Sequence, residues 1–237
     1  HCGLVGSEMC IRDRSASGEV NDIGVTLSFE IDNDDTGGGD VYDSHSIAFD
    51  LGDAGKLTFH GHGGSSALGA KDDVMPAAWE EPWDILPNAE THLIGGAGGD
   101  NMFVYSYAHE SGFTGTVSYV NAADAVTDVS STSYGVEYTG MEGLTVGYAQ
   151  QDVEVTTNTT GDESTMYAKY AIGGITVGIQ MSENDMESGT DYESTGIGVS
   201  YQVNDDLTLS YGNHEIEAVS SGNPDQEAAA LGFSYTM

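Results

Sequence analysis

Ile175-Thr-Val-Gly-Ile-Gln-Met181 is the stretch of sequence that decides the fold. Its apolar side chains fall at positions 175, 177, 179 and 181, and small or polar side chains fall between them. Successive side chains of a strand point to opposite faces, so the stretch predicts a strand with one apolar and one polar face. A soluble sheet packed on a core gives the same alternation, so one such strand does not decide the class of protein.

The same alternation recurs along the chain and predicts about twelve strands. Their residue ranges are 22–31, 44–51, 56–62, 101–109, 113–120, 133–138, 144–151, 164–172, 175–182, 194–203, 207–214 and 227–237. Apolar sets such as Leu207, Leu209 and Tyr211 alternate with Thr, Ser, Gly, Ala and Gln. A hydrophobic core is not built from the second group, so we expect the apolar face to be covered by something outside the sheet.

The connections between the predicted strands alternate in length and composition. Residues 173–174 and 204–206 are tight turns with the Gly, Asn and Asp that hairpins require, whereas 152–163, 183–193 and 215–226 are long and acidic. Short turns at one rim and long loops at the other are typical of a transmembrane barrel, which satisfies every backbone hydrogen bond in lipid. The sequence therefore predicts an all-β fold, an antiparallel up-and-down transmembrane β-barrel.

The composition excludes some functions. The chain has 39 acidic and 5 basic residues, for a net charge of −34. A nucleic-acid partner is excluded, because its phosphates demand Lys and Arg. No run approaches the ~20 apolar residues of a membrane helix.

Residues 1–14 differ from the rest of the chain. They hold both cysteines and both arginines, Arg12 and Arg14, and show no strand pattern. The stretch 5–14 resembles a translated sequencing-adapter tail, so we expect 1–14 to be a disordered artefact and exclude it from the fold. The alternative is a natural, irregular N-terminus.

Residues 15–237 resemble a 16-stranded bacterial outer-membrane general porin of the alphaproteobacterial type. The most specific part is Lys56-Leu-Thr-Phe-His-Gly-His62, followed by a long loop and then Asp100-Asn-Met-Phe-Val-Tyr-Ser-Tyr107. The motifs Gly140-Met-Glu-Gly-Leu-Thr-Val-Gly-Tyr148 and Gly196-Ile-Gly-Val-Ser-Tyr201 are typical of the family but diffuse. The resemblance implies about 12 of 16 strands in a fragment that lacks both ends, a homotrimer, and the outer membrane of a Gram-negative bacterium.

The resemblance also implies that the long connection 63–100 folds into the lumen as a constriction loop. A structureless loop of this length is uncommon unless it is functional, and Trp79 and Trp83 suit packing against a wall better than exposure to solvent. The alternative is a solvated surface loop. Its predicted constriction residues are the carboxylates Asp72, Asp73, Glu80, Glu81, Asp84 and Glu90.

The wall facing that loop departs from the family pattern. The family usually places a cluster of arginines there, but this chain has no arginine after residue 14. The predicted lumen-wall residues are Lys56, His60, His62, Glu137, Lys169 and Gln180. An eyelet that is acidic nearly all round favours cations.

The acidic stretch 32–43 carries a metal hypothesis. Asp32, Asp34, Thr36, Asp40 and Asp43 match positions 1, 3, 5, 9 and 12 of an EF-hand-like loop, which would bind Ca²⁺. The last position holds Asp rather than Glu, and no helices flank the stretch, so a plain acidic external loop is the alternative. Otherwise we expect no cofactor. A metal site at His60 and His62 is weighed against simple lumen lining.

We therefore expect a passive diffusion channel for ions and small hydrophilic solutes, weakly cation-selective, in contact with outer-membrane lipid. The alternative function is a secreted all-β adhesin or structural protein whose apolar face packs on a second sheet. An outer-membrane enzyme is a third possibility, but the sequence contains no Gly-x-Ser-x-Gly, His-Glu-x-x-His or phosphate-binding loop.

Overall fold

In the computed structural model the described residues form one antiparallel sheet, in which thirteen strands are hydrogen-bonded in sequence order. It describes residues 12–31, 42–78, 80–86, 94, 99–121, 130–154, 161–185, 190–219 and 224–236. The strands are β1 (Arg12–Val20), β2 (Ile23–Ile31), β3 (Tyr42–Asp50), β4 (Lys56–His62), β5 (Met102–Ala108), β6 (Phe113–Val120), β7 (Ser130–Met141), β8 (Leu144–Glu154), β9 (Asp162–Ile172), β10 (Ile175–Asp185), β11 (Tyr192–Gln202), β12 (Leu207–Ala218) and β13 (Gln226–Tyr235). The up-and-down antiparallel architecture predicted from the sequence is confirmed.

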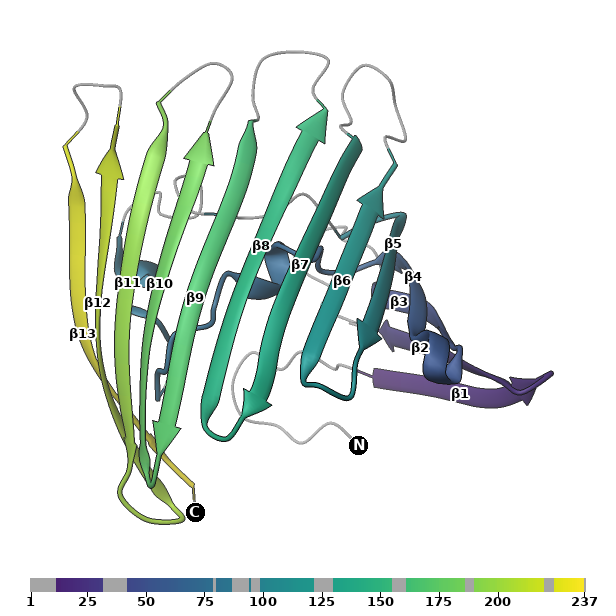
Figure 1. The fold of residues 1–237 in the computed structure, drawn as a ribbon, viewed down its shortest axis with the longest axis horizontal. Coiled ribbons are helices and arrows are strands. Elements are labelled where there is room, and N and C mark those ends of the chain that lie inside the picture. Colours follow the sequence, from purple (N-terminus) through teal and green to yellow (C-terminus); the bar gives the residue numbers. More distant parts are fainter. Residues whose placement is uncertain are drawn as a thin grey trace.

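The hairpin before β10 shows how the local sequence produces this order. Gly173 has a φ of 59°, a left-handed conformation that glycine adopts at little cost, so the chain reverses over two residues. Ile175 then pairs with Ile172 on β9 and with Tyr201 on β11. The tight turns lie along one rim, at the bottom of Figure 1.

The faces of the strands follow the predicted alternation. In β10, Ile175, Val177 and Ile179 are 43–46% exposed, whereas Gln180 on the opposite face is 3% exposed. Apolar residues therefore point away from the protein, and polar ones point inward. The described strands form a single sheet, so no second sheet covers the apolar face as the adhesin interpretation requires.

The described residues form thirteen strands, one more than the twelve segments that the sequence predicts. All twelve predicted segments form strands, but β1 precedes them and includes residues 12–14 of the segment that the sequence assigned to an artefact. Asn21 and Asp22 both have positive φ, of 52° and 62°, as a tight hairpin turn requires. The prediction missed β1 because Ser15-Ala-Ser-Gly18 has small side chains and almost no apolar alternation.

The sheet curves into an arc with β1 and β13 at its two ends (Figure 1). Among the described residues these two edge strands are each paired on one side only. No described helix is of the length and hydrophobicity needed to cross a membrane.

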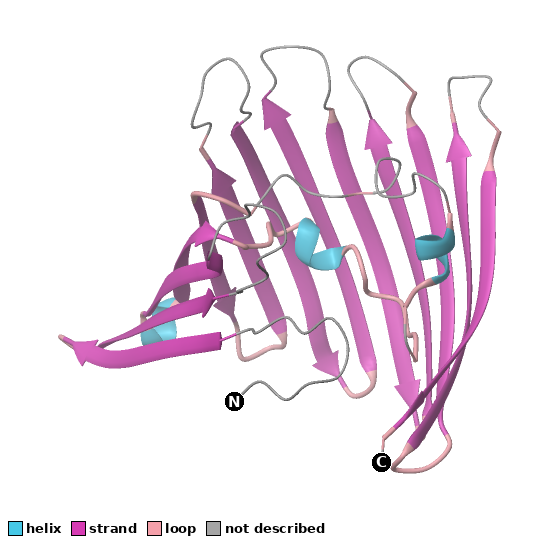
Figure 2. Ribbon diagram, turned by 180° about the vertical axis from the view of Figure 1, so that it is seen from behind, coloured by secondary structure: helices cyan, strands magenta, loops and turns pink. Residues whose placement is uncertain are grey.

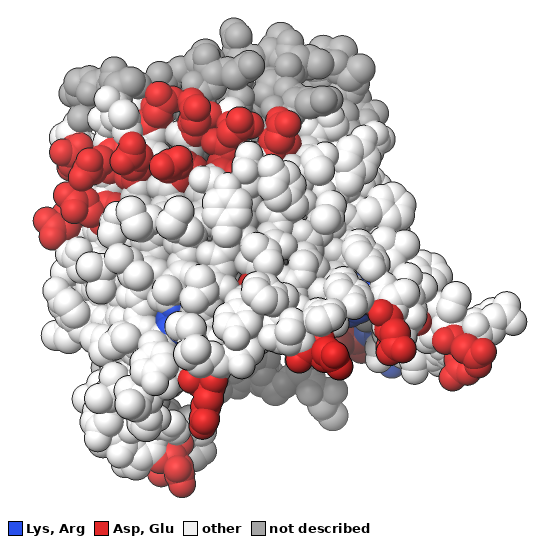
Figure 3. Space-filling view, viewed as in Figure 1, with Lys and Arg blue, Asp and Glu red and all other residues white. Residues whose placement is uncertain are grey.

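The convex face of the arc carries its charges at the rims. In Figure 3, acidic side chains gather along the upper rim and at the lower turns, with a nearly uncharged band between them. Glu183, Glu193 and Glu217, near the upper ends of β10, β11 and β12, are exposed on this face. An apolar band bordered by polar rims suits a sheet that stands in a bilayer.

Candidate functional site

The described parts of the segment 63–100 lie against the concave face of the sheet, as Figure 2 shows from behind. The segment runs from the end of β4 across to β12 and β13, and it carries two short 3-10 helices, η2 (Gly69–Lys71) and η3 (Pro82–Ile85). Residues 79, 87–93 and 95–98 of this segment are outside the described residues. The described residues contact the wall in three clusters and, between the second and the third, through Pro76 and through the Ala78 amide, which donates to Ser210 on β12.

The first contact is a group of buried serines. The backbone amide of Ala67 donates to the hydroxyls of Ser118 on β6 (3.0 Å) and Ser133 on β7 (2.9 Å). Ser66 donates to Gln151 on β8 at 3.1 Å. Next to these bonds Leu68 is fully buried in a small cluster with Ile94 and Ala149. A buried backbone amide needs an acceptor, so the wall serines hold this part of the segment in place.

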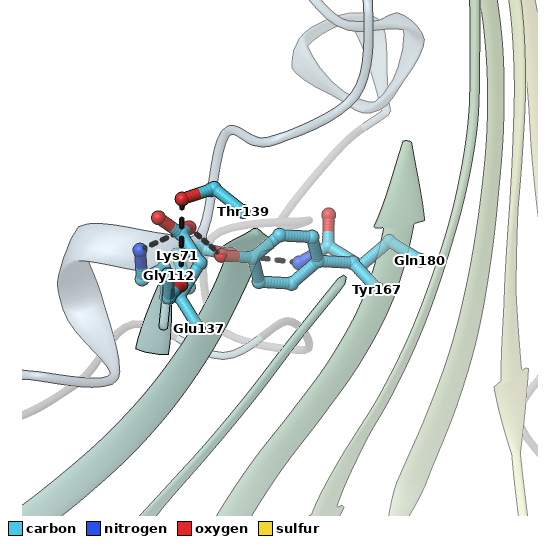
Figure 4. Close-up of polar contacts among 6 residues, drawn as sticks. All are labelled: Lys71, Gly112, Glu137, Thr139, Tyr167 and Gln180. Atoms are coloured by element: carbon cyan, nitrogen blue, oxygen red, sulfur yellow. Dashed lines mark hydrogen bonds and ion pairs between the residues drawn. The ribbon is translucent and has the colours of Figure 1, made fainter. Parts of the chain in front are cut away.

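The second contact surrounds Lys71, the only lysine of the segment (Figure 4). Its ammonium lies 3.0 Å from a carboxylate oxygen of Glu137 on β7, and the Tyr167 hydroxyl donates to the same oxygen. The Lys71 ammonium and that of Lys169 lie 5.7 and 5.9 Å from the centre of the Tyr167 ring. Gln180 donates to the Lys71 carbonyl at 2.7 Å. The Lys71 charge is therefore neutralised by the wall.

Between the second and third contacts the segment passes over inward-facing glycines. A Cβ at Gly178 would lie 2.7 Å from Cδ of Pro76, and one at Gly198 would lie 2.9 Å from the Pro76 carbonyl oxygen. A Cβ at Gly212 would lie 2.7 Å from Cγ of Pro82. Real Cβ atoms do not approach this closely, so the missing side chains allow the segment to lie directly on the strand backbone.

The third contact joins η3 to β11 and β12. Trp83 and Leu86 pack on buried Tyr192 and Ile216. Glu81, which is 5% exposed, accepts hydrogen bonds from the Met75 amide at 2.6 Å and from the Trp83 indole at 3.2 Å. Its carboxylate therefore fixes the bend of the segment rather than facing open solvent.

Burial and mutual repulsion alter the acidity of the segment's carboxyl groups. Burial raises the pKa of Glu81 to about 7, against the hydrogen bonds from Met75 and Trp83 that favour its charged form. Desolvation also raises the pKa values of Asp73 and Asp84, and nearby carboxylates add to the rise.

The predicted constriction residues differ in their exposure to solvent. Asp72, Asp73, Glu80 and Asp84 are exposed on the segment, whereas Glu81 is buried against the wall. Glu90 lies outside the described residues.

The predicted wall residues fall into two separate groups. Glu137, Lys169 and Gln180 meet around the Lys71 contact described above. Lys56 and His60 line a cavity of about 470 Å³ on the concave side of β1–β4, with Asp50 on the neighbouring strand. His62 lies 2.5 Å from Asp100 at the end of the 63–100 segment. The described residues bring no group of three His, Cys, Asp or Glu side chains together for a metal ion, the pair His60 and His62 included.

The predicted calcium ligands are not placed by the structure. Asp32, Asp34, Thr36 and Asp40 lie outside the described residues, and Asp43 falls in β3 with its side chain outside the description.

Sequence reasoning missed the groups that seat the segment. No pattern in the sequence distinguishes Tyr167, Ser118, Ser133 or Lys71 from other polar residues of the chain. One available signal was the glycines at positions 178, 196, 198 and 212, all on inward faces of adjacent strands. Side-chain-free positions on one face indicate that another part of the chain lies close.

Solved structures similar to this chain are outer-membrane proteins. OmpT of Vibrio cholerae shares 19% identity at a TM-score of 0.71, covering 98% of this chain and 76% of that one. An anion-selective porin from Comamonas acidovorans shares 15% identity at a TM-score of 0.69, covering 98% and 75%. At these identities the likeness shows the fold alone. None of the curated proteins matches the chain.

The family profile for Gram-negative porins matches residues 14–237, which is nearly the whole chain. This range begins inside β1 and includes every contact between the 63–100 segment and the wall. The chain therefore belongs to the Gram-negative porin family and is a channel protein of the outer membrane.

Proposed function

We propose that the protein is a passive, weakly cation-selective channel for ions and small hydrophilic solutes, with the 63–100 segment as its constriction. The observation that carries this proposal is the charge balance of the segment. Its one lysine is paired with Glu137, while Asp72, Asp73, Glu80 and Asp84 remain exposed. A narrow passage lined by one sign of charge concentrates ions of the opposite sign.

The positive groups of the wall support the same sign of selectivity. Among the described residues the lysines are Lys56, Lys71 and Lys169, and the last two lie together beside Glu137 and Tyr167. Lys56 has Asp50 directly opposite it in the β3–β4 register. Arg14 on β1 pairs with Phe29, whose side chain lies on the outward apolar face, so it points away from the segment. No cluster of lysines faces the exposed carboxylates from the described strands.

Neutralising the segment should move the reversal potential toward chloride. In the full-length protein, Asp72→Asn, Asp73→Asn, Glu80→Gln and Asp84→Asn together remove the four exposed carboxylates of the proposed constriction. We expect the reversal potential in a KCl gradient across a planar bilayer to lose most of its cation preference. The difference in reversal potential between the variant and the wild type should shrink above ~0.1 M salt, where the Debye length falls below ~10 Å.

A matched control removes four carboxylates from the turns of the opposite rim, Asp53→Asn, Glu110→Gln, Glu142→Gln and Asp205→Asn, all of which are exposed. This variant has the same net charge as the first and should keep most of the cation preference. A chloride-preferring wild type, or equal effects of the two variants, would contradict the proposed role of the segment.

The cation preference should also fall as the pH is lowered through about 7. Burial raises the pKa of Glu81 to about 7, so this carboxyl becomes neutral as the pH falls through that value. Burial also raises the pKa values of Asp73 and Asp84. Reversal potentials measured between pH 8 and pH 5 should show this step, and Glu81→Gln should remove its upper part. An unchanged step in Glu81→Gln would show that another group titrates.

The Glu81 carboxyl group also makes the packing of the 63–100 segment on the wall depend on pH. Because its folded pKa lies above the ordinary value of 4.5, Glu81 favours the seated segment most below pH 4.5. That contribution is lost as the pH rises through about 7.

We also propose a homotrimer. A similar solved structure, OmpT of Vibrio cholerae, is described as a trimer form. Sedimentation of the full-length protein in detergent should give three protomer masses after correction for the micelle. A single protomer mass would count against it.

Calcium binding by residues 32–43 stays a proposal. Isothermal titration should detect Ca²⁺ binding that is lost in Asp32→Asn with Asp34→Asn. Unchanged binding in that variant would place the ion elsewhere.

A further inference from the structure

A cavity of about 270 Å³ lies between the 63–100 segment and the inner face of β11–β13. This volume is slightly smaller than that of most ligand pockets, which run from ~300 to 1,000 Å³. Its walls are mostly apolar and include Met75, Pro82 and Ala230, and its floor includes the backbone of Gly196 and Gly212. A small molecule with a carbon body fits such a surface.

His214 on β12 is the polar group of this cavity that has no partner. It is 4% exposed, and neither of its ring nitrogens makes a hydrogen bond. Its Nδ1 lies close to Gly196, where an added Cβ would be 3.0 Å away. A buried imidazole without partners is costly, because the lost hydrogen bonds to water are not replaced. A ligand that donates a hydrogen bond to the ring would remove that cost.

The charged side chains that line the cavity determine which sign of charge a ligand would carry. Glu80, Glu81 and Asp84 line it, and no lysine or arginine does. A ligand with positive charge is therefore favoured at one end, and an apolar body is favoured by the remaining walls.

A metal ion does not meet these requirements. Metal coordination needs donors that converge to about 2.0–2.3 Å from one point, and no three described His, Cys, Asp or Glu side chains converge in this way. A primary ammonium is less demanding, because its three N–H groups point outward and bridge donors that lie farther apart. In such a complex one N–H would donate to the acceptor nitrogen of a neutral imidazole, and the others would donate to carboxylates.

We propose that this cavity is a binding site for a small organic ammonium ion, held by His214 and by Glu80 and Asp84, with its alkyl chain against Met75 and Pro82. The proposed channel would thus also bind a second class of molecule, small organic ammonium ions. The site requires the seated segment but does not depend on the sign of the ion selectivity.

The test is isothermal titration of the full-length protein in detergent at pH 8, with n-butylammonium as the probe. We expect one saturable site per chain. Neutral 1-butanol and tetramethylammonium, which lacks N–H groups, should each bind at least about tenfold more weakly, the loss expected for charge-assisted hydrogen bonds. Equal binding of 1-butanol or of tetramethylammonium would overturn the proposal, as would no binding of butylammonium.

Variants locate the site. Glu80→Gln with Asp84→Asn alters only exposed side chains, so the fold should persist, and it should weaken butylammonium binding about tenfold. Asp53→Asn with Glu142→Gln changes the net charge equally and should leave the affinity unchanged. If both pairs of substitutions weaken butylammonium binding equally, the ion is attracted by the net charge of the protein and there is no specific site. Displacement of butylammonium by equimolar Zn²⁺ would show a metal site instead.

This outcome is separable from the channel proposal. Intact butylammonium binding in a chloride-preferring pore would overturn the selectivity and support the site. A cation-preferring pore that does not bind butylammonium would support the proposed selectivity and overturn the proposed binding site.

Discussion

Gly198→Val is expected to unseat the 63–100 segment and raise the single-channel conductance of the porin. The added Cβ would lie 2.9 Å from the carbonyl oxygen of Pro76 and 3.2 Å from its nitrogen. These are backbone atoms, so no side-chain rotation relieves the clash and the segment must move. Overpacking costs about 1–3 kcal/mol, which lowers the ratio of seated to unseated segment about 5- to 150-fold.

A glycine in open surroundings provides the control. Gly115 on β6 has no atom within 4 Å of its added Cβ, so Gly115→Val makes the same chemical change without touching the segment. It should keep the wild-type conductance. Chymotrypsin should cleave after Trp83 faster in Gly198→Val only, because the Trp83 side chain packs on the wall in the seated state. Equal conductance in the two variants would mean that the segment does not narrow the channel.

The strands were predictable because each one repeats a strong local signal. Ile175, Val177 and Ile179 must all face one side of a strand, and lipid is the solvent that tolerates them there. β1 escaped prediction because its small side chains carry little hydrophobic contrast. The turn residues Asn21 and Asp22 were the better signal, since both have the positive φ of a tight hairpin.

The contacts that hold the 63–100 segment on the wall were not predictable in the same way. Lys71 and Glu137 are 66 residues apart, and which wall carboxylate meets the lysine depends on the register of several strands. The acidity of the segment could be read from the sequence. The burial of Glu81 could not, because it depends on the bend that its own hydrogen bonds to Met75 and Trp83 stabilise.

Glu137→Gln is expected to loosen the segment and to weaken the cation preference, both through Lys71. The Lys71 and Glu137 side chains are only 25% and 29% exposed, so removing the carboxylate leaves a half-buried ammonium without its counter-charge. Breaking a fully buried pair costs about 3–5 kcal/mol and an exposed one about 0–1 kcal/mol, so a cost of about 1–2 kcal/mol fits this site. Chymotrypsin cleavage after Trp83 should then be about 5- to 30-fold faster, because it follows the population of the open segment.

The double variant Lys71→Met with Glu137→Leu separates the charge pair from the shape of the contact. Removing both charges leaves no unpaired ion, so cleavage should be slower than in Glu137→Gln and close to the wild-type rate. The reversal potential should move toward chloride in Glu137→Gln, where the freed Lys71 adds positive charge, and should return toward the wild type in the double variant. If the double variant is cleaved faster than Glu137→Gln, the segment is held by the bulk and hydrogen bonds of these side chains, and the ion pair is not what seats it.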